Sequence, residues 1–349
     1  MFGGGAERVV LTLLNALDKE KYELILALVK KEGKYLDLIP ADVEVIDLKV
    51  SKARYSIFKI YKLIKEKKPD FIFTSLAHLN LLIALIRPLF SKDIKFIARE
   101  SNTVTENNKL DKYPKINEFL YKNVYKNYDQ IITQAKAMKI DLAENFGIDE
   151  DKMIIIQNPV DCDNTLSRSK QEDIELPKKY NLLAIGRLGA QKGFDMLLNI
   201  ISKLDDSYYL TILGDGDDRS KLEKQIKDLG IGKRVNLVGF HDNPYAYMKS
   251  SDLLVLSSRY EGLPNVVLEA NSLGLPVVAF DSAGGTGEII DDGRNGFLVE
   301  PFDEDEFAKT IQKARDYSFD NQAIKEHTKS NFSADKIIKE YERVFNHNS

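Results

Sequence analysis

The feature that most constrains the fold of this chain is a short apolar run followed at once by a turn and a helix. Residues 252–256 read Asp-Leu-Leu-Val-Leu, which is typical of a buried parallel strand. Gly262 and Pro264 then turn the chain into a helix that continues past Glu269. Glu261 therefore lies at the carboxyl end of a strand, where open α/β sheets bind ligands, and Glu269 lies two helical turns further on. A capped surface helix with solvated glutamates is the competing interpretation.

Apolar runs alternate with amphipathic segments along the whole chain. This pattern predicts α/β domains with mostly parallel sheets covered by helices on both faces. A length of 349 residues is most simply two domains. The expected strands are 22–29, 43–48, 71–74, 95–98, 130–133, 153–157, 182–185, 209–213, 235–238, 252–256, 277–280 and 296–299. The expected helices of the first half are 9–17, 55–66, 79–87, 115–126 and 135–146, with a mobile polar loop at 102–112.

Glycine-rich turns follow several expected strands of the second half. They are Gly186-Arg187-Leu188 leading to Gln191-Lys192-Gly193, then Gly214-Asp215-Gly216, Gly284-Gly285 and Gly293-Arg294-Asn295-Gly296. In this order, together with residues 259–270, they resemble the pattern of the retaining glycosyltransferase family 4, whose members have the two-domain GT-B fold. The opening Gly3-Gly4-Gly5-Ala6-Glu7-Arg8 is similar to the Gly-Gly-Ala-Glu-Arg loop of one branch, the bacterial polysaccharide and lipopolysaccharide glycosyltransferases.

The resemblance implies two Rossmann-like domains with doubly wound parallel sheets that face a cleft. It makes residues 1–160 the acceptor-binding domain and 161–332 the nucleotide-sugar donor domain, with a C-terminal helix at 333–349 that crosses back to the first domain. In relatives a β-strand precedes the opening glycine loop, whereas here only Met1 and Phe2 precede it. We therefore expect the first strand to be absent and the N-terminal domain to be truncated, the alternative being a compensated or inactive domain.

The resemblance also assigns roles in the donor domain. It implies that Arg187 and Lys192 bind the donor's phosphates, where fixed cations stabilise the charge of the leaving group. It implies that Glu261 contacts the donor's sugar and that Glu269 contacts the ribose hydroxyls. Glu261, Arg187 and Lys192 are thus the expected catalytic residues. The other expected donor-binding residues are Gly186, Gly214, Gly262, Leu263 and Asn265.

Two further hypotheses concern the donor. The loop 284–287 precedes Glu288, and a glycine loop at a helix start offers free N–H groups to a phosphate or a sugar. A plain helix entry explains the same residues. Arg259 and Tyr260 are placed beside the nucleotide base as a guess.

Acceptor contacts are expected in the opening loop and at the carboxyl ends of N-terminal strands. A glycine-rich loop that opens a helix can approach a ligand closely. For His78, which follows the expected strand 71–74, an ordinary loop histidine is the competing interpretation. The acceptor or cleft residues are Gly4, Gly5, Glu7, His78, Arg99 and Asn102.

No metal and no cofactor are predicted. Asp215-Gly216-Asp217 looks like a metal-binding pair of aspartates, but it lies in a loop that the resemblance makes part of a site where cationic side chains replace the metal. The four histidines and single cysteine of the chain are scattered and suggest no ligand cluster.

Composition indicates a cytoplasmic protein. Hydrophobic and charged contents of 43% and 30% are ordinary for a soluble chain, and Cys162 alone cannot form an internal disulfide. Residues 51–140 hold 18 Lys and Arg against 8 Asp and Glu, which suggests peripheral contact with an anionic membrane, at the inner face of the plasma membrane, or an anionic acceptor. A solvated lysine-rich face explains the excess equally well. No nucleic-acid motif accompanies the charge, so no nucleic-acid partner is expected.

These observations favour a retaining glycosyltransferase. We expect it to move a hexosyl or N-acetylhexosaminyl group from a nucleotide-sugar, most simply a UDP-sugar, to a glycan or lipid-linked acceptor in bacterial surface polysaccharide, lipopolysaccharide or glycoprotein assembly. The alternatives are a UDP-sugar epimerase of the same fold and a non-catalytic nucleotide-sugar binding protein.

Overall fold

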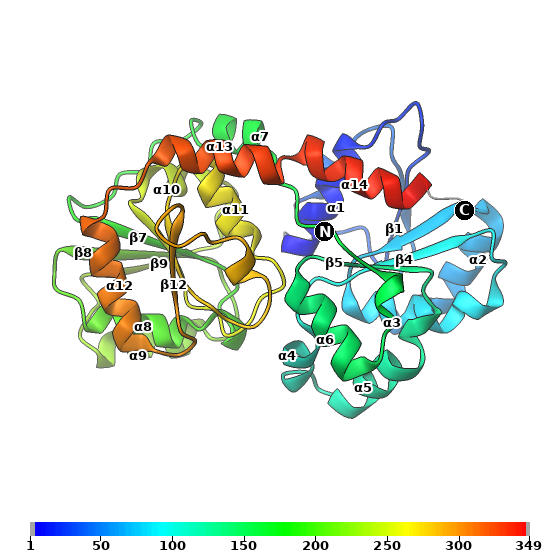
Figure 1. Cartoon of the computed structure of the whole chain (residues 1–349), viewed down its shortest axis with the longest axis horizontal. Coiled ribbons are helices and arrows are strands. Elements are labelled where there is room, and N and C mark those ends of the chain that lie inside the picture. The colour runs from blue at the N-terminus through cyan, green and yellow to red at the C-terminus, as the bar shows by residue number, and fades with distance from the viewer. Residues whose placement is uncertain (1–3, 347–349) are drawn as a thin grey trace. The chain divides into compact units, whose positions relative to one another are not determined.

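The computed structural model describes residues 4–346, which belong to two compact units (Figure 1). The first unit runs to Pro159 and includes the chain from Ala334 onward, and the second unit is Val160–Ser333. In both units the named strands pair in parallel, which confirms the predicted α/β class. Met1, Phe2 and Gly3 of the expected opening loop lie outside the described residues.

The second unit is built on a six-stranded sheet in the order β12-β11-β10-β7-β8-β9. The chain runs outward from β7 through β8 to β9, then returns to the other side of β7 at β10. The strand order therefore reverses between β7 and β10, and open α/β sheets bind ligands at such a switch point. The strands are β7 Tyr180–Ile185, β8 Tyr208–Leu213, β9 Val235–Gly239, β10 Leu253–Leu256, β11 Val277–Phe280 and β12 Gly296–Val299.

Helices cover both faces of this sheet (Figure 1). Side chains alternate between the faces along each strand, so Leu182 and Ala184 of β7 point to one core, where they pack with Leu197 and Ile311. On that face lie α8 Phe194–Ser202, α9 Arg219–Asp228 and α12 Glu304–Asp316. The others are α7 Cys162–Arg168, α10 Pro244–Ser250, α11 Asn265–Ser272 and α13 Asn321–Phe332, which contact one another.

The sheet of the first unit is in two parts. Four strands pair in the order β3-β4-β5-β6, and β1 pairs with β2 in a separate two-stranded sheet. In the described part of the chain the first element is the helix α1, and no strand precedes it. The strands are β1 Ile25–Leu28, β2 Glu44–Asp47, β3 Phe71–Thr74, β4 Lys95–Arg99, β5 Gln130–Thr133 and β6 Met153–Ile155.

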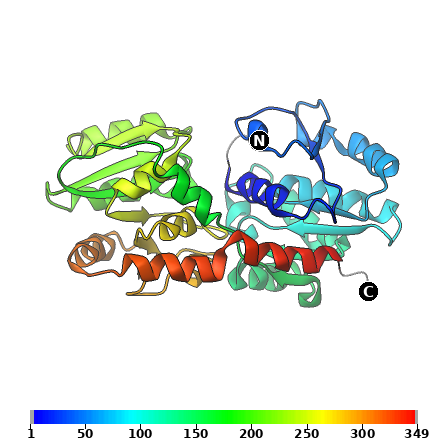
Figure 2. The same ribbon diagram turned by 90° about the horizontal axis from the view of Figure 1, so that it is seen from above.

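Two apolar layers sandwich the four-stranded sheet. Ile97 and Ile132 face α1 Gly5–Ala16 and α14 Ala334–Asn346, which lie side by side (Figures 1 and 2). Phe345 of α14 stacks on Phe71 at 4.5 Å between ring centroids. The opposite layer holds Phe96 of β4. Its helices are α2 Ile57–Lys67, α3 Ala77–Ile86, α4 Val104–Lys109, α5 Pro114–Asn123 and α6 Lys136–Phe146.

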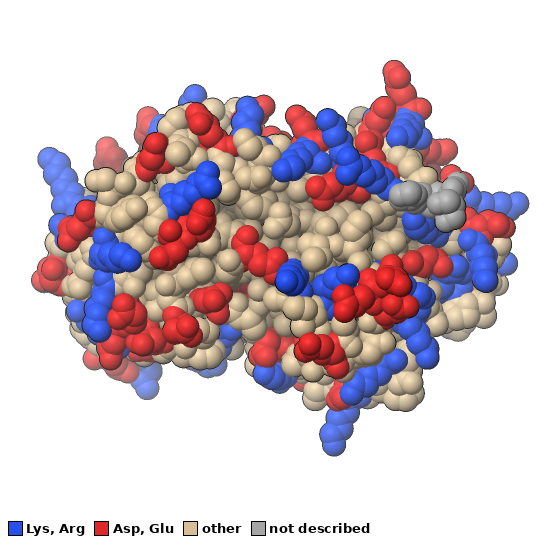
Figure 3. Space-filling view, viewed as in Figure 1, with Lys and Arg blue, Asp and Glu red and all other residues tan. Residues whose placement is uncertain are grey.

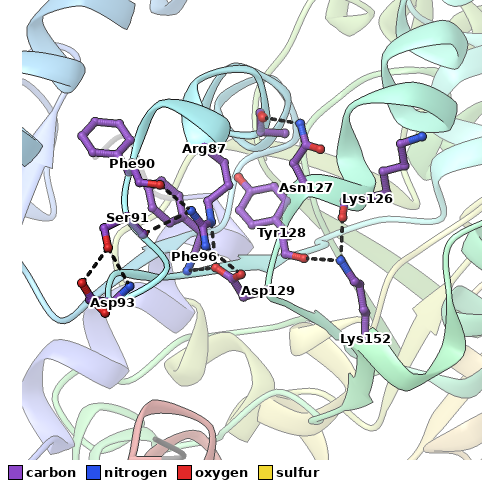
Figure 4. A network of polar contacts seen from close by, with 11 residues as sticks. Arg87, Phe90, Ser91, Asp93, Phe96, Lys126, Asn127, Tyr128, Asp129 and Lys152 are labelled. Atoms are coloured by element: carbon purple, nitrogen blue, oxygen red, sulfur yellow. Dashed lines mark hydrogen bonds and ion pairs between the residues drawn. The ribbon is translucent and has the colours of Figure 1, made fainter. Parts of the chain in front are cut away.

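An ion pair between the buried Arg87 and the partly exposed Asp129 fastens the end of α3 to the sheet (Figure 4). The Arg87 guanidinium donates two hydrogen bonds of 2.9 Å to the carboxylate of Asp129, which also accepts from the backbone N–H of Phe96. Arg87 donates further to the carbonyl oxygens of Phe90 and Ser91. Each nitrogen of the buried Arg87 guanidinium therefore has a hydrogen-bond partner.

The prediction of a mobile loop at 102–112 is wrong, because residues Val104–Lys109 form the helix α4. Its first turn is capped from outside. The Asp141 carboxylate on α6 accepts hydrogen bonds from the backbone N–H of Thr105 at 3.0 Å and from its hydroxyl at 2.5 Å. A cap supplied from a distant helix satisfies the free N–H groups of a helix start without leaving a local sequence signal.

The expected helix at 55–66 belongs to the core. Ile64 of α2 is buried, and Ile57, Ile60 and Tyr61 pack partly buried against the same cluster. None of the helices in residues 4–346 combines the length and the apolar character that crossing a bilayer demands. On the face in Figure 3, acidic and basic side chains intermingle over both units.

Two adjacent charged residues at the end of β4 are buried in the first unit. Arg99 is 1% exposed, and its guanidinium donates to the hydroxyl of Tyr341 at 3.1 Å, to Ser75 Oγ at 2.8 Å and to Asn158 Oδ1 at 2.5 Å. Glu100 is equally buried and accepts from Asn80 Nδ2, at 3.0 Å, and from the hydroxyls of Tyr121 and Tyr125. Burial raises the pKa of the Glu100 carboxyl above its ordinary value.

This pKa predicts how stability depends on pH. A carboxyl whose pKa is higher in the folded state binds its proton more tightly there, so the free energy of unfolding falls as the pH rises from the ordinary value toward the raised one. Glu100→Gln cannot ionise and should lack this fall. We expect urea unfolding at about pH 5 and about pH 8 to show a smaller pH effect in the variant than in the wild type.

The matched control is Glu118→Gln, because Glu118 is exposed and the neighbouring Lys122 lowers its pKa. The free energy of unfolding of this control should decrease with rising pH as it does in the wild type. If Glu100→Gln kept the fall and lost stability at both pH values, the carboxylate would be ionised and required by its tyrosine partners.

Candidate active site

Four loops meet at the carboxyl edge of the six-stranded sheet. They follow β11, β10, β7 and β8, which are neighbours in that order, so their loops are neighbours too. Every residue predicted to bind the donor lies in one of these loops or in the helix after β10. The sheet order thus gathers residues between Gly186 and Asn265 of the sequence at one edge.

The loops after β7 and β8 are in backbone contact. Gly214 has a φ of +140°, and a Cβ atom there would lie 1.8 Å from the carbonyl oxygen of Gly186. The N–H of Leu188 donates to the carbonyl oxygen of Asp215 at 3.0 Å, and the side chain of Leu188 is fully buried. Only glycine fits at position 214, because both the space and the backbone angle exclude a side chain. The glycines of this part of the pattern therefore bring two loops together.

The loops after β10 and β11 are joined in the same way. Gly284, at a φ of +123°, would place a Cβ atom 2.0 Å from the carbonyl oxygen of Glu261. The N–H of Glu261 donates to the carbonyl oxygen of Ala283 at 2.9 Å, and that of Gly285 donates to Gly262. The expected helix that would contain Glu288 is only a three-residue 3₁₀ turn, Thr286–Glu288. The glycines here serve backbone contact with Glu261, and no α-helix begins at them.

The centre of the edge is an ion pair between two of the predicted catalytic residues. Lys192 Nζ lies 2.6 Å from Glu261 Oε1, and the hydroxyl of Ser258 donates to the same oxygen at 2.6 Å. Glu261 is 5% exposed, and the Lys192 side chain is largely covered. Lys192 closes the turn Ala190–Lys192, just before α8 begins. A buried carboxylate and an ammonium group are therefore fixed side by side at the switch point.

Arg187 is placed differently from Lys192. Its side chain is 77% exposed and pairs with Asp217, also exposed, at 3.1 Å. The structure therefore holds one of the two predicted phosphate-binding cations within the loops and leaves the other on the surface at the same edge. An exposed pair of this kind contributes little to stability.

The remaining donor residues surround the start of α11. Gly262 and Leu263 are buried in the turn, and Asn265 is the partly exposed first residue of the helix. Glu269, further along α11, is 6% exposed. The carboxylate of Glu269 is therefore buried on the helix that starts at the site.

The placement of Arg259 and Tyr260 beside a nucleotide base stays a prediction, and the structure gives both residues partners within the second unit. The Tyr260 side chain is buried, and its backbone pairs with Ala283. The Arg259 guanidinium binds the Asp195 carboxylate through two hydrogen bonds, of 2.8 and 2.6 Å. Both residues are engaged within the second unit.

The predicted acceptor residues of the first unit fall into two groups. Gly4 and Gly5 are exposed at the start of α1, and the Glu7 carboxylate accepts the N–H of Gly4 at 3.0 Å, so Glu7 caps its own helix. His78, exposed on α3, follows β3, and Asn102 follows β4, its neighbour. Both therefore stay candidates for an acceptor contact.

Arg99 does not stay a candidate. Its three guanidinium nitrogens are all bound inside the unit, to Tyr341, Ser75 and Asn158. The strand end at Arg99 faces the core between β4 and α14, so the charge serves the unit's interior.

The Asp215-Gly216-Asp217 loop makes local contacts. Asp215 Oδ1 accepts the N–H of Gly216, and Asp217 pairs with Arg187. Within residues 4–346 no group of three or more His, Cys, Asp or Glu side chains is placed to hold a metal ion.

Comparison with known proteins decides the family. The model described as Glycosyltransferase Family 4 matches residues 3–164, and that described as Glycosyl transferases group 1 matches residues 167–330. An N-acetylgalactosaminyltransferase of Campylobacter jejuni, named as acting on N-acetylgalactosamine-N,N'-diacetylbacillosaminyl-diphospho-undecaprenol, is 31% identical over 85% of this chain and 83% of its own length. The chain belongs to glycosyltransferase family 4.

Other relatives of this family 4 glycosyltransferase agree. The amylovoran biosynthesis glycosyltransferase AmsD of Erwinia amylovora is 28% identical over 85% of this chain and 82% of its own. Among solved structures, Anabaena Alr3699/HepE in complex with UDP-glucose superposes with a TM-score of 0.79 at 19% identity, covering 98% of this chain and 96% of the other. The last comparison shows the shared fold. Nothing in these comparisons favours the epimerase alternative.

Several residues around the ion pair were missed by the sequence analysis. They are Asp195, Ser257 and Ser258. The hydrogen bond from Gln191 Nε2 to the carbonyl oxygen of Tyr260 was missed as well. Ser257 and Ser258 are visible in the sequence as the end of the strand β10, but nothing local shows that their hydroxyls turn toward Lys192 and Glu261. Asp195 stands three residues after Lys192, a spacing that gave no reason to single it out.

The backbone contact at Gly214 predicts a large effect of a single methyl group. Gly214→Ala must displace the Gly186 carbonyl, so we expect a loss of more than about 3 kcal/mol in the free energy of unfolding of the second unit, and loss of activity. Gly230→Ala is the control, because Gly230 also has a positive φ, +68°, but has no atom within 4 Å of a Cβ. It should cost about 1–2 kcal/mol. Urea unfolding checks both, and equal losses would contradict the contact.

Proposed function

We propose that this glycosyltransferase moves a hexosyl or N-acetylhexosaminyl group from a nucleotide-sugar, most simply a UDP-sugar, to a glycan or lipid-linked acceptor, with retention of anomeric configuration. Two names among the relatives support the substrates. The Campylobacter enzyme is named for a diphospho-undecaprenol acceptor, and HepE was solved with UDP-glucose. The natural setting is the assembly of a bacterial surface polysaccharide, lipopolysaccharide or glycoprotein.

The observation that carries the proposal is the ion pair of Lys192 and Glu261 at the switch point. Breaking the bond between the sugar and the diphosphate leaves negative charge on the departing phosphate. A cation whose orientation is fixed beforehand stabilises that charge without a reorganisation cost. Glu261 and the surrounding loops hold Lys192 in this way. Arg187 lies at the same edge with an exposed side chain, and a phosphate could replace its exposed partner Asp217.

In the proposed reaction the acceptor hydroxyl attacks the anomeric carbon from the face that the diphosphate leaves. The new carbon–oxygen bond forms as the carbon–phosphate-oxygen bond breaks, and the acceptor's proton passes to the departing phosphate oxygen. The products are the glycosylated acceptor and a nucleoside diphosphate. Glu261 then orients the sugar and Glu269 the ribose, and neither has to act as a general base.

Metal independence is part of the proposal. Lys192 and Arg187 would supply the positive charge that a divalent ion supplies in other transferases. Transfer should therefore persist in the presence of EDTA.

Single substitutions test this function. With radiolabelled UDP- and GDP-sugars, membrane extract as acceptor and EDTA present, we expect transfer of one sugar by the wild type. Lys192→Ala and Arg187→Ala should each lower the rate about 10²–10³-fold, because each removes charge stabilisation at the leaving group. Glu261→Ala should lose transfer as well.

Lys203→Ala is the control. Lys203 caps the C-terminal end of α8 and makes an exposed ion pair with Asp305 of α12. It should transfer at the wild-type rate. Conversion of the free donor into its epimer would refute the proposal, and nucleotide binding without transfer would favour a binding protein.

We also propose that the enzyme is cytoplasmic and peripheral at the inner face of the plasma membrane, through a surface on the first unit called here the α4–α5 surface. Its large apolar side chains are Leu110, Tyr113, Ile116 and Phe119, which are 58%, 51%, 58% and 62% exposed. Ile116 and Phe119 are three residues apart on α5, so they share a face, and Tyr113 immediately precedes the helix. Lys109, Lys112, Lys115 and Lys122 lie within the same segment. Apolar side chains bordered by lysines suit an anionic bilayer surface.

Vesicle sedimentation tests the surface. The wild type should sediment with vesicles of anionic lipid and less with neutral ones, and added salt should weaken binding. The double variant Ile116→Asp/Phe119→Asp should bind at least about tenfold more weakly, because each side chain gives about 1.5–3 kcal/mol when buried. Phe302→Asp, an equally exposed aromatic residue of the second unit, should bind as the wild type does. Equal binding of all three proteins would contradict the α4–α5 surface.

A further inference from the structure

We propose that Arg259 and Asp195 form a positioning pair that holds Lys192 against Glu261, an inference that rests on the proposed role of that ion pair in donor chemistry. Arg259 lies two residues before Glu261, and Asp195 lies three residues after Lys192. The two residues link the segments that carry the ion pair.

The pair has the geometry of a strong link. Arg259 Nη1 donates to Asp195 Oδ1 at 2.8 Å and Nη2 donates to Oδ2 at 2.6 Å, so the guanidinium and the carboxylate meet through two parallel hydrogen bonds. Such pairs are stronger and geometrically more specific than single contacts. Both side chains are partly covered, which screens the pair less than an exposed one. The hydrogen bonds from Arg259 also lower the pKa of Asp195, so the carboxylate is ionised at neutral pH.

Backbone contacts extend the link over the whole turn. Arg259 Nη1 donates to the carbonyl oxygen of Ala190 at 2.7 Å, and its backbone N–H donates to that of Gln191 at 2.8 Å. In return Gln191 Nε2 donates to the carbonyl oxygen of Tyr260 at 3.1 Å. The hydroxyl of Ser257 donates to the carbonyl oxygen of Lys192 itself at 3.0 Å. The segments 190–195 and 257–261 are thus tied at several points around the ion pair.

This arrangement solves a problem that a lysine poses. Its side chain is long and flexible, and holding it in one orientation costs conformational entropy. Fixing the backbone on both sides of the ion pair restricts where Nζ can lie before any donor binds. Weakening the pair should therefore loosen Lys192 without removing a group that touches the substrate.

Asp195→Asn is the decisive variant, because it removes one charge and keeps the size of the side chain. We expect kcat to fall roughly tenfold, as for loss of a hydrogen-bonded charge contact, with the KM for the donor changed much less. The kcat of the double variant Asp195→Asn/Arg259→Gln should be no lower than that of the less active single variant. The exchanged pair Asp195→Arg/Arg259→Asp should recover part of the rate.

The control is Asp305→Asn, which removes one of two carboxylate partners of Lys203, the cation that caps the end of α8, and should leave kcat unchanged. If Arg259 contacts the donor directly, Arg259→Gln will raise the donor KM, Asp195→Asn will not lower kcat, and the exchange will not recover activity. A pair that only stabilises the fold would lower the unfolding temperature and leave kcat of the folded enzyme unchanged. Either outcome overturns the proposal.

A second readout does not depend on transfer. Acetylation of Lys192 by acetic anhydride, followed by mass spectrometry, reports how firmly its ammonium group is held. Labelling should be slow in the wild type and in Asp305→Asn and several-fold faster in Asp195→Asn. Equal labelling in all three refutes the positioning pair. Should the wild type transfer no sugar yet show this labelling difference, the proposed function fails and the positioning pair stands.

Discussion

Backbone-to-backbone packing at the carboxyl edge of one parallel sheet underlies the candidate site. Gly214 against Gly186 and Gly284 against Glu261 bring the loops after four adjacent strands to distances that no side chain could allow. Sheet order decides which loops can meet, and the glycines decide how closely. Because these contacts involve rigid main chain, the polar groups on them are held with little freedom. The chemistry of Lys192 and Glu261 depends on that rigidity.

The two units use buried charge in different ways. In the first unit the charged groups of Arg87, Arg99 and Glu100 are hydrogen-bonded to fixed partners, so these charges fasten helices to strands. In the second unit the buried Glu261 shares its ion pair with a lysine that stands at the edge of the sheet, next to glycine loops. A buried charged group whose hydrogen bonds are all made helps to specify the fold. Charge held at a switch point is in a position to meet a ligand. This contrast separates Lys192, in the loop after β7, from Arg99, the last residue of β4.

Local patterns predicted most of the elements and the donor side of the site. The strand β10, the turn at Gly262 and the helix α11 follow from apolar content and turn residues, and each is found within a residue or two of its expected place. The errors have a common cause. The helix α4 is capped by Asp141 from α6, the interior position of Arg99 depends on Tyr341 of α14, and Asp195 meets Arg259 across 64 residues. Each is a contact between distant segments, and neither propensity nor spacing encodes such contacts.

The two-part sheet of the first unit has its own consequence. Within residues 4–346 the strands β1 and β2 pair only with each other, and a lone parallel pair is marginally stable in water. Its persistence depends on neighbouring packing such as that of Tyr22 against Phe71 and Phe345. Among the described residues β3 is an edge strand of the four-stranded sheet, whereas β4 is paired on both sides. Amide hydrogens of β1 and β2 should therefore exchange with solvent well before those of β4.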